Sequence, residues 1–151
     1  MKQLELTKGF QTIIDDDDFD KVSQYKWYVN SDGYAVRNGY LNKKRVTVRL
    51  HRFIMNAGPD QLIDHVNKNR LDNRKSNLRF ASKSENAINS KLSNRNSTGY
   101  SGVSRVKNSS KYRARIRVNS KEIYLGLFST VQEASEAYNE AAKQYFGKFA
   151  R

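Results

Sequence analysis

Apolar and polar residues alternate in short runs through the first 55 residues and again over residues 102–128. Alternation with a period of two is typical of strands that bury one face. A helical period follows over residues 131–146, whereas Asn, Asp, Arg, Lys and Ser dominate residues 64–86. The sequence therefore predicts an α+β protein, with a β-rich N-terminal segment and a separate sheet and helix near the C-terminus.

The most regular alternation lies in three runs near the C-terminus, GVSRV, KYRARIRV and KEIYLGLF, which KNSS and NS turns separate. Successive strand residues point to opposite faces of a sheet. In the middle run one face is apolar and the other is basic, with Tyr112, Ala114, Ile116 and Val118 opposite Arg113, Arg115 and Arg117. We predict a three-stranded antiparallel sheet whose apolar face packs against the rest of the domain and whose basic face can contact a partner.

A helix is predicted to cover the apolar face of this sheet. Thr130 and Glu133 form a capping box at its start, and Gly147 is a stop signal. Its alanines would allow close packing, since apolar residues recur at spacings of three and four: Ala134, Ala137, Tyr138, Ala141, Ala142 and Tyr145.

The N-terminal segment carries strand and turn signals of its own. WYVNSDGYAVRN predicts a hairpin that turns at Asp32-Gly33. The acidic run DDDDFD at residues 15–20 lacks the Gly and Glu of an EF-hand loop, so we expect a solvated turn there rather than a calcium site. RVTVRLHRF predicts a strand with Val46, Val48 and Leu50 inward and with Arg45, Arg49 and His51 outward, where they could contact DNA.

The net charge of the chain limits the kinds of molecule that it is expected to bind. The chain has 28 Lys and Arg against 15 Asp and Glu, a net charge of +13, and 11% of its residues are aromatic. This balance favours nucleic acid as the partner. A membrane surface is the competing polyanion, but the sequence has no long apolar run and no basic amphipathic helix. The absence of cysteine excludes disulfides and thiolate zinc sites and is compatible with a reducing cytoplasm.

The same charges divide the chain into two parts. Residues 1–90 carry 16 basic and 11 acidic side chains, and residues 91–151 carry 12 and 4, which gives net charges of +5 and +8. Between them, NSKLSNRNSTG is rich in Asn and Ser and can bury little. We therefore predict two domains, 1–90 and 99–151, joined by a linker at 91–98, whose basic residues either follow a phosphate backbone or are simply solvated.

The second domain resembles a known family. YSGVSR, KYRARIRV, YLGLFST and EASEAYNEAAKQYFGKFA are similar to successive blocks of the APETALA-two (ethylene-response-factor) DNA-binding domain. On their own, three alternating arginines would favour the solvated face of a sheet. The resemblance implies instead that this face enters the major groove of double-stranded DNA. By position it implies contacts from Ser104, Arg113, Arg115, Arg117 and Tyr124; Tyr124 stands where the family usually has Trp, and Arg115 often replaces a Glu.

The polar stretch 64–86 contains His65, one of only two histidines in the chain. His65 directly follows Asp64 and comes after Leu62-Ile63, as at the end of a strand. Residues 82–85 form a second capping box, which places Asn86 in the first turns of a helix. Strand, loop, short strand and helix make a ββα unit that could bring Asp64, His65 and Asn86 into one cleft. The alternative is a solvated loop with an inert histidine.

The first interpretation requires side chains that can bind a metal ion and accept a proton. Asp64 and Asn86 offer the hard oxygen ligands that Mg²⁺ prefers, with water and phosphate oxygens completing the shell. A neutral His65 beside that ion could deprotonate an attacking water. The residues alone therefore allow a metal-dependent site for hydrolysis as well as an inert loop.

LHRFIM, IDHVN, LDNRKSNLRF and the following Asn86 resemble the blocks of the HNH (ββα-metal) nucleases, in particular phage and intron-associated homing endonucleases. The resemblance covers about residues 1–90. It implies that His65 is the general base, that Asp64 and Asn86 bind Mg²⁺ or Mn²⁺, and that Asn77 fixes the loop that holds His65. It also implies that Asp72, Asn73 and Arg74 are scaffold for that loop. Many relatives have His where this chain has Asn86.

Together these observations predict a site-specific DNA endonuclease of the homing type. We expect it to act as a monomer on double-stranded DNA, without a membrane partner, in the cytoplasm of a phage-infected or bacterial host cell. One alternative is a DNA-binding regulator with a degraded HNH scaffold, against which the intact Asp64, His65, Asn77 and Asn86 argue. The other is an RNA-binding accessory protein, which would leave the metal site unused.

Overall fold

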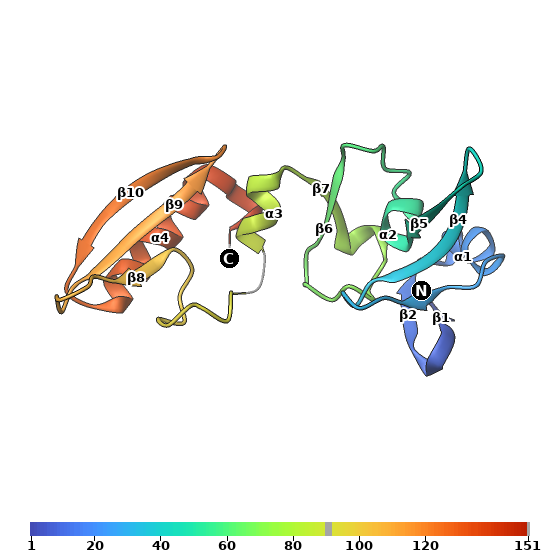
Figure 1. Cartoon of the computed structure of the whole chain (residues 1–151), viewed down its shortest axis with the longest axis horizontal. Helices are drawn as coiled ribbons and strands as arrows, with labels where there is room; N and C mark the ends of the chain where they lie inside the picture. Colours follow the sequence, from blue (N-terminus) through green and yellow to red (C-terminus); the bar gives the residue numbers. More distant parts are fainter. Residues whose placement is uncertain (90–91, 151) are drawn as a thin grey trace. The chain divides into compact units, whose positions relative to one another are not determined.

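The computed structural model describes residues 1–89 and 92–150, and the chain forms two compact units, Met1–Ala81 and Ser82–Arg151 (Figure 1). Residues 90, 91 and 151, which include the first residue of the predicted linker, lie outside the described residues. The mixture of small antiparallel sheets and short helices confirms the predicted α+β class. Among the described residues, no helix is both long enough and apolar enough to cross a bilayer.

The first unit contains three small antiparallel sheets and two α-helices. The first sheet pairs β1 (Lys2–Glu5) with β2 (Gln11–Ile14), on either side of the short 3-10 helix η1 (Thr7–Gly9). The second joins β3 (Tyr28–Val29), β4 (Ala35–Leu41) and β5 (Lys44–Arg49) in sequence order. The third pairs β6 (Leu62–His65) with β7 (Leu78–Ala81), and η2 (Lys75–Asn77) precedes β7. The helices are α1 (Asp16–Ser23) and α2 (Leu50–Ile54).

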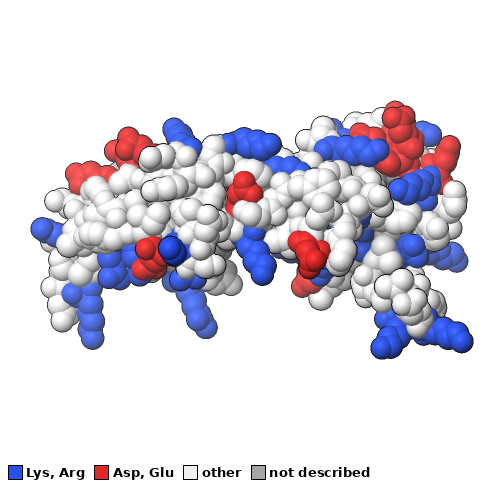
Figure 2. All heavy atoms as spheres, turned by 90° about the horizontal axis from the view of Figure 1, so that it is seen from above, with Lys and Arg blue, Asp and Glu red and all other residues white. Residues whose placement is uncertain are grey.

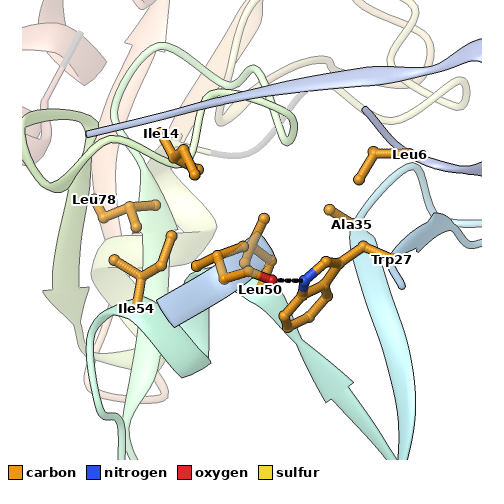
Figure 3. Packing of buried hydrophobic residues seen from close by; sticks show 8 residues of the cluster. Leu6, Ile14, Trp27, Ala35, Leu50, Ile54 and Leu78 are labelled. Atoms are coloured by element: carbon orange, nitrogen blue, oxygen red, sulfur yellow. Dashed lines mark hydrogen bonds between the residues drawn. The ribbon is translucent and has the colours of Figure 1, made fainter. Parts of the chain in front are cut away.

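One hydrophobic core joins the sheets and helices of the first unit. Figure 3 shows side chains from β2, β4, α2 and β7 in one cluster with Trp27. The Trp27 indole is buried, and its Nε1 donates a hydrogen bond to the carbonyl of Val22 at 2.9 Å. Leu78 belongs to this core and pairs with His65 across β6 and β7. The strands that carry the candidate site are therefore anchored in the core.

The strand predicted across RVTVRLHRF is confirmed only up to Arg49. Arg45 and Arg49 are exposed as expected, but the chain turns into α2 at Leu50. A helical turn lets Leu50 and Ile54, four residues apart, both enter the core. The outward orientation predicted for His51 is therefore wrong.

Two tight hairpins shape the second sheet of this unit. The predicted turn at Asp32-Gly33 is confirmed, since β3 pairs with β4 and Gly33 has a φ of +81°. The turn between β4 and β5 places Asn42 and Lys43 in the left-handed region, with φ values of 49° and 61°. Two successive left-handed residues are the signature of a type I′ turn, which matches the twist of the strands it joins.

The second unit begins with α3 (Lys83–Asn89), and its sheet has the order β10-β9-β8. These strands are β8 (Val103–Arg105), β9 (Tyr112–Val118) and β10 (Lys121–Phe128). The helix α4 (Val131–Phe146) packs on the sheet, and η3 (Gly147–Phe149) follows it. The three-stranded antiparallel sheet with one covering helix is confirmed.

Local signals predicted most of α4 correctly. Both hydrogen bonds of the Thr130–Glu133 capping box form, and Gly147 ends the helix. The stripe is wrong at one position, because Tyr145 is 46% exposed while Phe146 is buried. Close packing is also imposed at Gly102, where a Cβ atom would lie 2.2 Å from the Tyr138 ring.

Candidate active site

Asp64 and His65 are the last two residues of β6, and both side chains are buried. The register with β7 places Arg79 directly opposite Asp64. Arg79 donates from Nε to Oδ2 of Asp64 at 2.9 Å, and its Nη2 lies 2.8 Å from the same oxygen. The carboxylate is therefore held at the strand end by a guanidinium from the neighbouring strand.

Asn77 closes the loop that follows His65. Its Nδ2 donates to the carbonyl oxygen of Asp72 at 2.8 Å, and its Oδ1 accepts from the backbone N–H of Asn67 at 3.0 Å. The backbone of Asn77 also accepts a hydrogen bond from Val66 at 2.9 Å. One buried amide thus ties both ends of the loop, which is the geometry that a loop-fixing residue needs.

The loop is held further by a charged pair at its centre. The Asp72 carboxylate accepts from Nε and Nη2 of Arg74, at 2.8 and 2.6 Å, and from Nδ2 of Asn67 at 2.8 Å. The Arg74 guanidinium holds the pKa of the Asp72 carboxyl below its usual range. Asp72 is therefore ionised at neutral pH and bonds to both sides of the loop.

His65 packs among other rings. Its centroid lies 5.1 Å from that of His51, edge to face, and 6.0 Å from that of Tyr34. Burial lowers the pKa of His65, and this effect outweighs the hydrogen bond with Asn73 and the charge of Asp64, which both raise it. The ring is therefore neutral at physiological pH, which is the form that a general base requires.

His51 is part of this cluster rather than of a DNA-facing surface. It lies in the first turn of α2, is buried, and packs 5.2 Å from the centroid of Tyr34. Burial, with a smaller contribution from His65, lowers its pKa to about 3. The spacing of Leu50 and Ile54 is the only sequence signal that could have placed His51 on a helix.

The acidic run at residues 15–20 is not a solvated turn, contrary to our expectation. Residues from Asp16 onward form α1, and Asp18 is buried. Asp15 accepts a hydrogen bond from the backbone N–H of Lys75 at 2.7 Å, and Asp18 forms an ion pair with Nζ of Lys75 at 2.8 Å. The run therefore holds η2, and with it Asn77.

Two comparisons with known proteins bear on this geometry. The HNH endonuclease family profile matches residues 49–88, a range that begins just before α2 and reaches into α3. Over 149 residues the chain is 32% identical to an uncharacterized HNH endonuclease of Acanthamoeba polyphaga mimivirus, and the alignment covers 95% of this chain and 74% of that protein. The chain belongs to the HNH endonuclease family.

Asn86, which the resemblance places in the metal site, lies on α3 in the second unit. The predicted capping box forms there, since Ser82 Oγ accepts from the N–H of Glu85 at 3.2 Å and the Glu85 carboxylate accepts from the N–H of Ser82 at 2.7 Å. Asn86 is exposed, in the first turns of the helix as expected. Its approach to Asp64 and His65 stays a prediction.

The metal-binding set that the sequence predicts, Asp64 and Asn86, is sparse. In the part of the chain that the structure describes, no three His, Cys, Asp or Glu side chains cluster as a metal site. One carboxylate with one carboxamide does not suit a closed zinc site. It does suit Mg²⁺, which is usually held by one or two carboxylates together with water and substrate phosphates. The residues present therefore fit a cation that takes most of its ligands from solvent and substrate.

Basic side chains project from both units of the chain (Figure 2). In the first unit, the guanidinium groups of Arg49 and Arg70 lie 5.7 and 4.6 Å from the centre of the Tyr34 ring. Tyr34 in turn contacts His65. Tyr34 thus contacts both of these positively charged groups and His65, the candidate base.

In the second unit, the register places the predicted contact residues on one face. Arg113 pairs with Ser104, and Arg115 pairs with Tyr124. Glu122, two residues before Tyr124, lies on this same face and forms an ion pair with Arg115 at 2.8 Å. The family match ends before this sheet, so the resemblance to the APETALA-two domain remains a prediction.

Proposed function

We propose that the protein is a site-specific DNA endonuclease of the homing type, with His65 as general base and with Asp64 and Asn86 as ligands of Mg²⁺ or Mn²⁺. The observation that carries the proposal is a buried, neutral histidine directly beside a buried carboxylate at the end of β6. We further propose that it acts as a monomer on double-stranded DNA, in the cytoplasm of a phage-infected or bacterial host cell.

The residues of the first unit can each be given a part in hydrolysis. A neutral imidazole at His65 takes a proton from the attacking water, and the charge of the neighbouring Asp64 stabilises the imidazolium that forms. Asn77 keeps the loop closed, so the ring stays in place. A divalent ion bound at Asp64 and Asn86 would supply stabilisation of the charge that develops on the phosphate and the leaving oxygen.

The test is cleavage of the DNA that surrounds the gene. The full chain should produce discrete cuts with Mg²⁺ or Mn²⁺ and none in EDTA. Cuts that persist in chelator would contradict the metal. Tight binding without cleavage under every metal would favour the regulator with a degraded scaffold, and preference for RNA would favour the accessory protein.

We also propose that one face of the β4–β5 hairpin contacts the DNA backbone. Paired residues of a hairpin lie on the same face. The register pairs Tyr40 with Arg45 and Val36 with Arg49, whereas Lys44 pairs with Leu41 on the opposite face. Arg45 and Arg49 therefore share a face, and Arg49 reaches the Tyr34 ring beside His65.

This hairpin offers a matched pair of substitutions. Arg45→Ala should weaken DNA binding and reduce the slope of log affinity against log salt by about one, the effect of losing one phosphate contact. Lys44→Ala removes the same charge from the adjacent residue on the other face and should leave the slope close to that of the wild type. Gel-shift titrations at several salt concentrations measure both. Equal losses from the two variants would contradict the proposed face.

We propose that the second unit resembles the APETALA-two domain in function and supplies most of the sequence preference. The basic face of β9 is the support for this, because its arginines lie opposite the face covered by α4. A sheet of this kind can present side chains to the edges of bases in the major groove. The proposed contacts are Ser104, Arg113, Arg115, Arg117 and Tyr124.

Replacement of Arg115 tests this second surface. If Arg115 binds a guanine edge, Arg115→Ala should weaken binding by about 1–3 kcal/mol and relax preference at one position of the site. Lys143→Ala, on an exposed position of α4, is the control for lost charge. Binding measured against a library of single-base variants separates the outcomes, since an equal loss on every sequence would mean that Arg115 contacts phosphate only.

A further inference from the structure

The contact between His65 and Asn73 indicates which nitrogen of the His65 ring carries a hydrogen. Nε2 of His65 is 3.3 Å from Oδ1 of Asn73, and both side chains are buried. A neutral imidazole carries its hydrogen on either ring nitrogen, and the partner of the ring decides which. The orientation of the Asn73 amide therefore decides whether Nε2 of His65 donates or accepts in this contact.

The other contacts of Asn73 settle how its amide is turned. Its Nδ2 donates to Oγ1 of Thr12 at 2.8 Å and lies 3.4 Å from the carbonyl oxygen of Arg70. The Thr12 hydroxyl donates in turn to the carbonyl oxygen of Leu71 at 2.7 Å. Backbone carbonyls only accept hydrogen bonds, so the donors run in one direction: Thr12 to Leu71, Asn73 to Thr12, and His65 to Asn73.

We propose that Thr12 and Asn73 are positioning residues that hold His65 in the tautomer with hydrogen on Nε2. The lone pair then lies on Nδ1, which becomes the nitrogen that takes the proton from water. The assignment of Nδ1 as the catalytic nitrogen rests on the proposed function, whereas the tautomer itself does not.

The backbone around this relay keeps it rigid. Thr12 is fully buried on β2, although it is 61 residues away from Asn73 in the sequence. Ile13 donates to the carbonyl of Leu71 at 2.9 Å, and Asn73 donates to the carbonyl of Ile13 at 2.8 Å. The loop thus runs beside β2 like an added strand. The buried Thr12 hydroxyl is used twice in this relay, since it accepts from Asn73 and donates to Leu71.

The first test is the tautomer of the wild-type chain without DNA or metal. With ¹⁵N-labelled histidine, NMR distinguishes the ring nitrogen that carries hydrogen from the one that does not. The chain has two histidines, and a His65→Gln variant identifies the signals of His65 by their loss. We expect hydrogen on Nε2. Hydrogen on Nδ1 would overturn the proposal, whether or not the protein proves to cut DNA.

The second test compares Thr12→Val with Thr12→Ser. Valine keeps the shape but removes the hydroxyl, so the Asn73 amide can turn and His65 should become a mixture of tautomers. Single-turnover cleavage should then fall by about 10–100-fold, as for other partners that orient a ligand or base. Serine keeps the hydroxyl and should retain the single tautomer and most of the rate.

Thermal denaturation of each variant separates positioning from stability. A loss of rate that is equal in both variants, or a single tautomer retained in Thr12→Val, would overturn the role of Thr12. Thr12→Ala serves as a second hydroxyl-free variant if the valine protein does not fold. If no variant and no wild-type protein cleaves DNA, the proposed function fails, while the NMR spectra still decide the tautomer.

Discussion

His65→Ala should lower the rate of DNA cleavage by about 10²–10⁴-fold, the usual contribution of a general base. The remaining histidine cannot take over this role. His51 is buried, and its pKa of about 3 makes it a far weaker base than an ordinary imidazole. The affinity for DNA should stay near that of the wild type, because the proposed DNA contacts come from other residues, most of them arginines.

Single-turnover cleavage beside a gel-shift titration measures the two properties of His65→Ala separately. Thermal unfolding completes the comparison, since His65 packs against Tyr34 and His51 and its loss leaves space in that cluster. A folded variant that binds DNA and cuts at the wild-type rate would remove His65 from the mechanism.

Asp64→Asn should abolish metal-dependent cleavage, because the change removes the only carboxylate from the proposed ligand set while keeping its size. Asp60→Asn is the matched control, since Asp60 is exposed and undergoes the same chemical change. Cleavage is measured over a series of Mg²⁺ concentrations for both variants. The control should follow the curve of the wild type, and Asp64→Asn should stay at background throughout.

A structural effect of Asp64→Asn has to be separated from the loss of metal. Arg79 is 15% exposed and bonds to Asp64, so the variant also weakens a charge-assisted pair. That loss is worth about 1–3 kcal/mol of unfolding free energy. A stable Asp64→Asn protein whose metal dependence matches that of the wild type would show that Asp64 is not a ligand.

Elements with local signals could be predicted from the sequence. The capping boxes at Thr130 and Ser82 each use residues three positions apart, and both form. The alternation of β9 likewise needs no distant contact to be recognised. In the candidate site, Asp64 and His65 are adjacent in the chain, which is why their pairing was visible.

The supports of the site could not be predicted in the same way. Thr12 is a single hydroxyl in a strand, and its role depends on a partner 61 residues away. Asp15 looked like part of a solvated run, but it caps the backbone of Lys75. His51 was misplaced because a short apolar pattern fits a strand and a helix equally well. Each of these depends on tertiary packing, which has no periodic signature.

The link between β2 and the loop after His65 limits how the HNH motif of this chain can evolve. The family motif occupies residues 49–88, yet its histidine is oriented by Thr12 and its loop is held by Asp15 and Asp18. The motif alone therefore lacks the residues that hold its histidine and its loop in position. Recombination that moved residues 49–88 alone into another gene would transfer the reactive groups without Thr12, Asp15 and Asp18, which hold them in place. We therefore expect the motif to be inherited together with the strands that precede it.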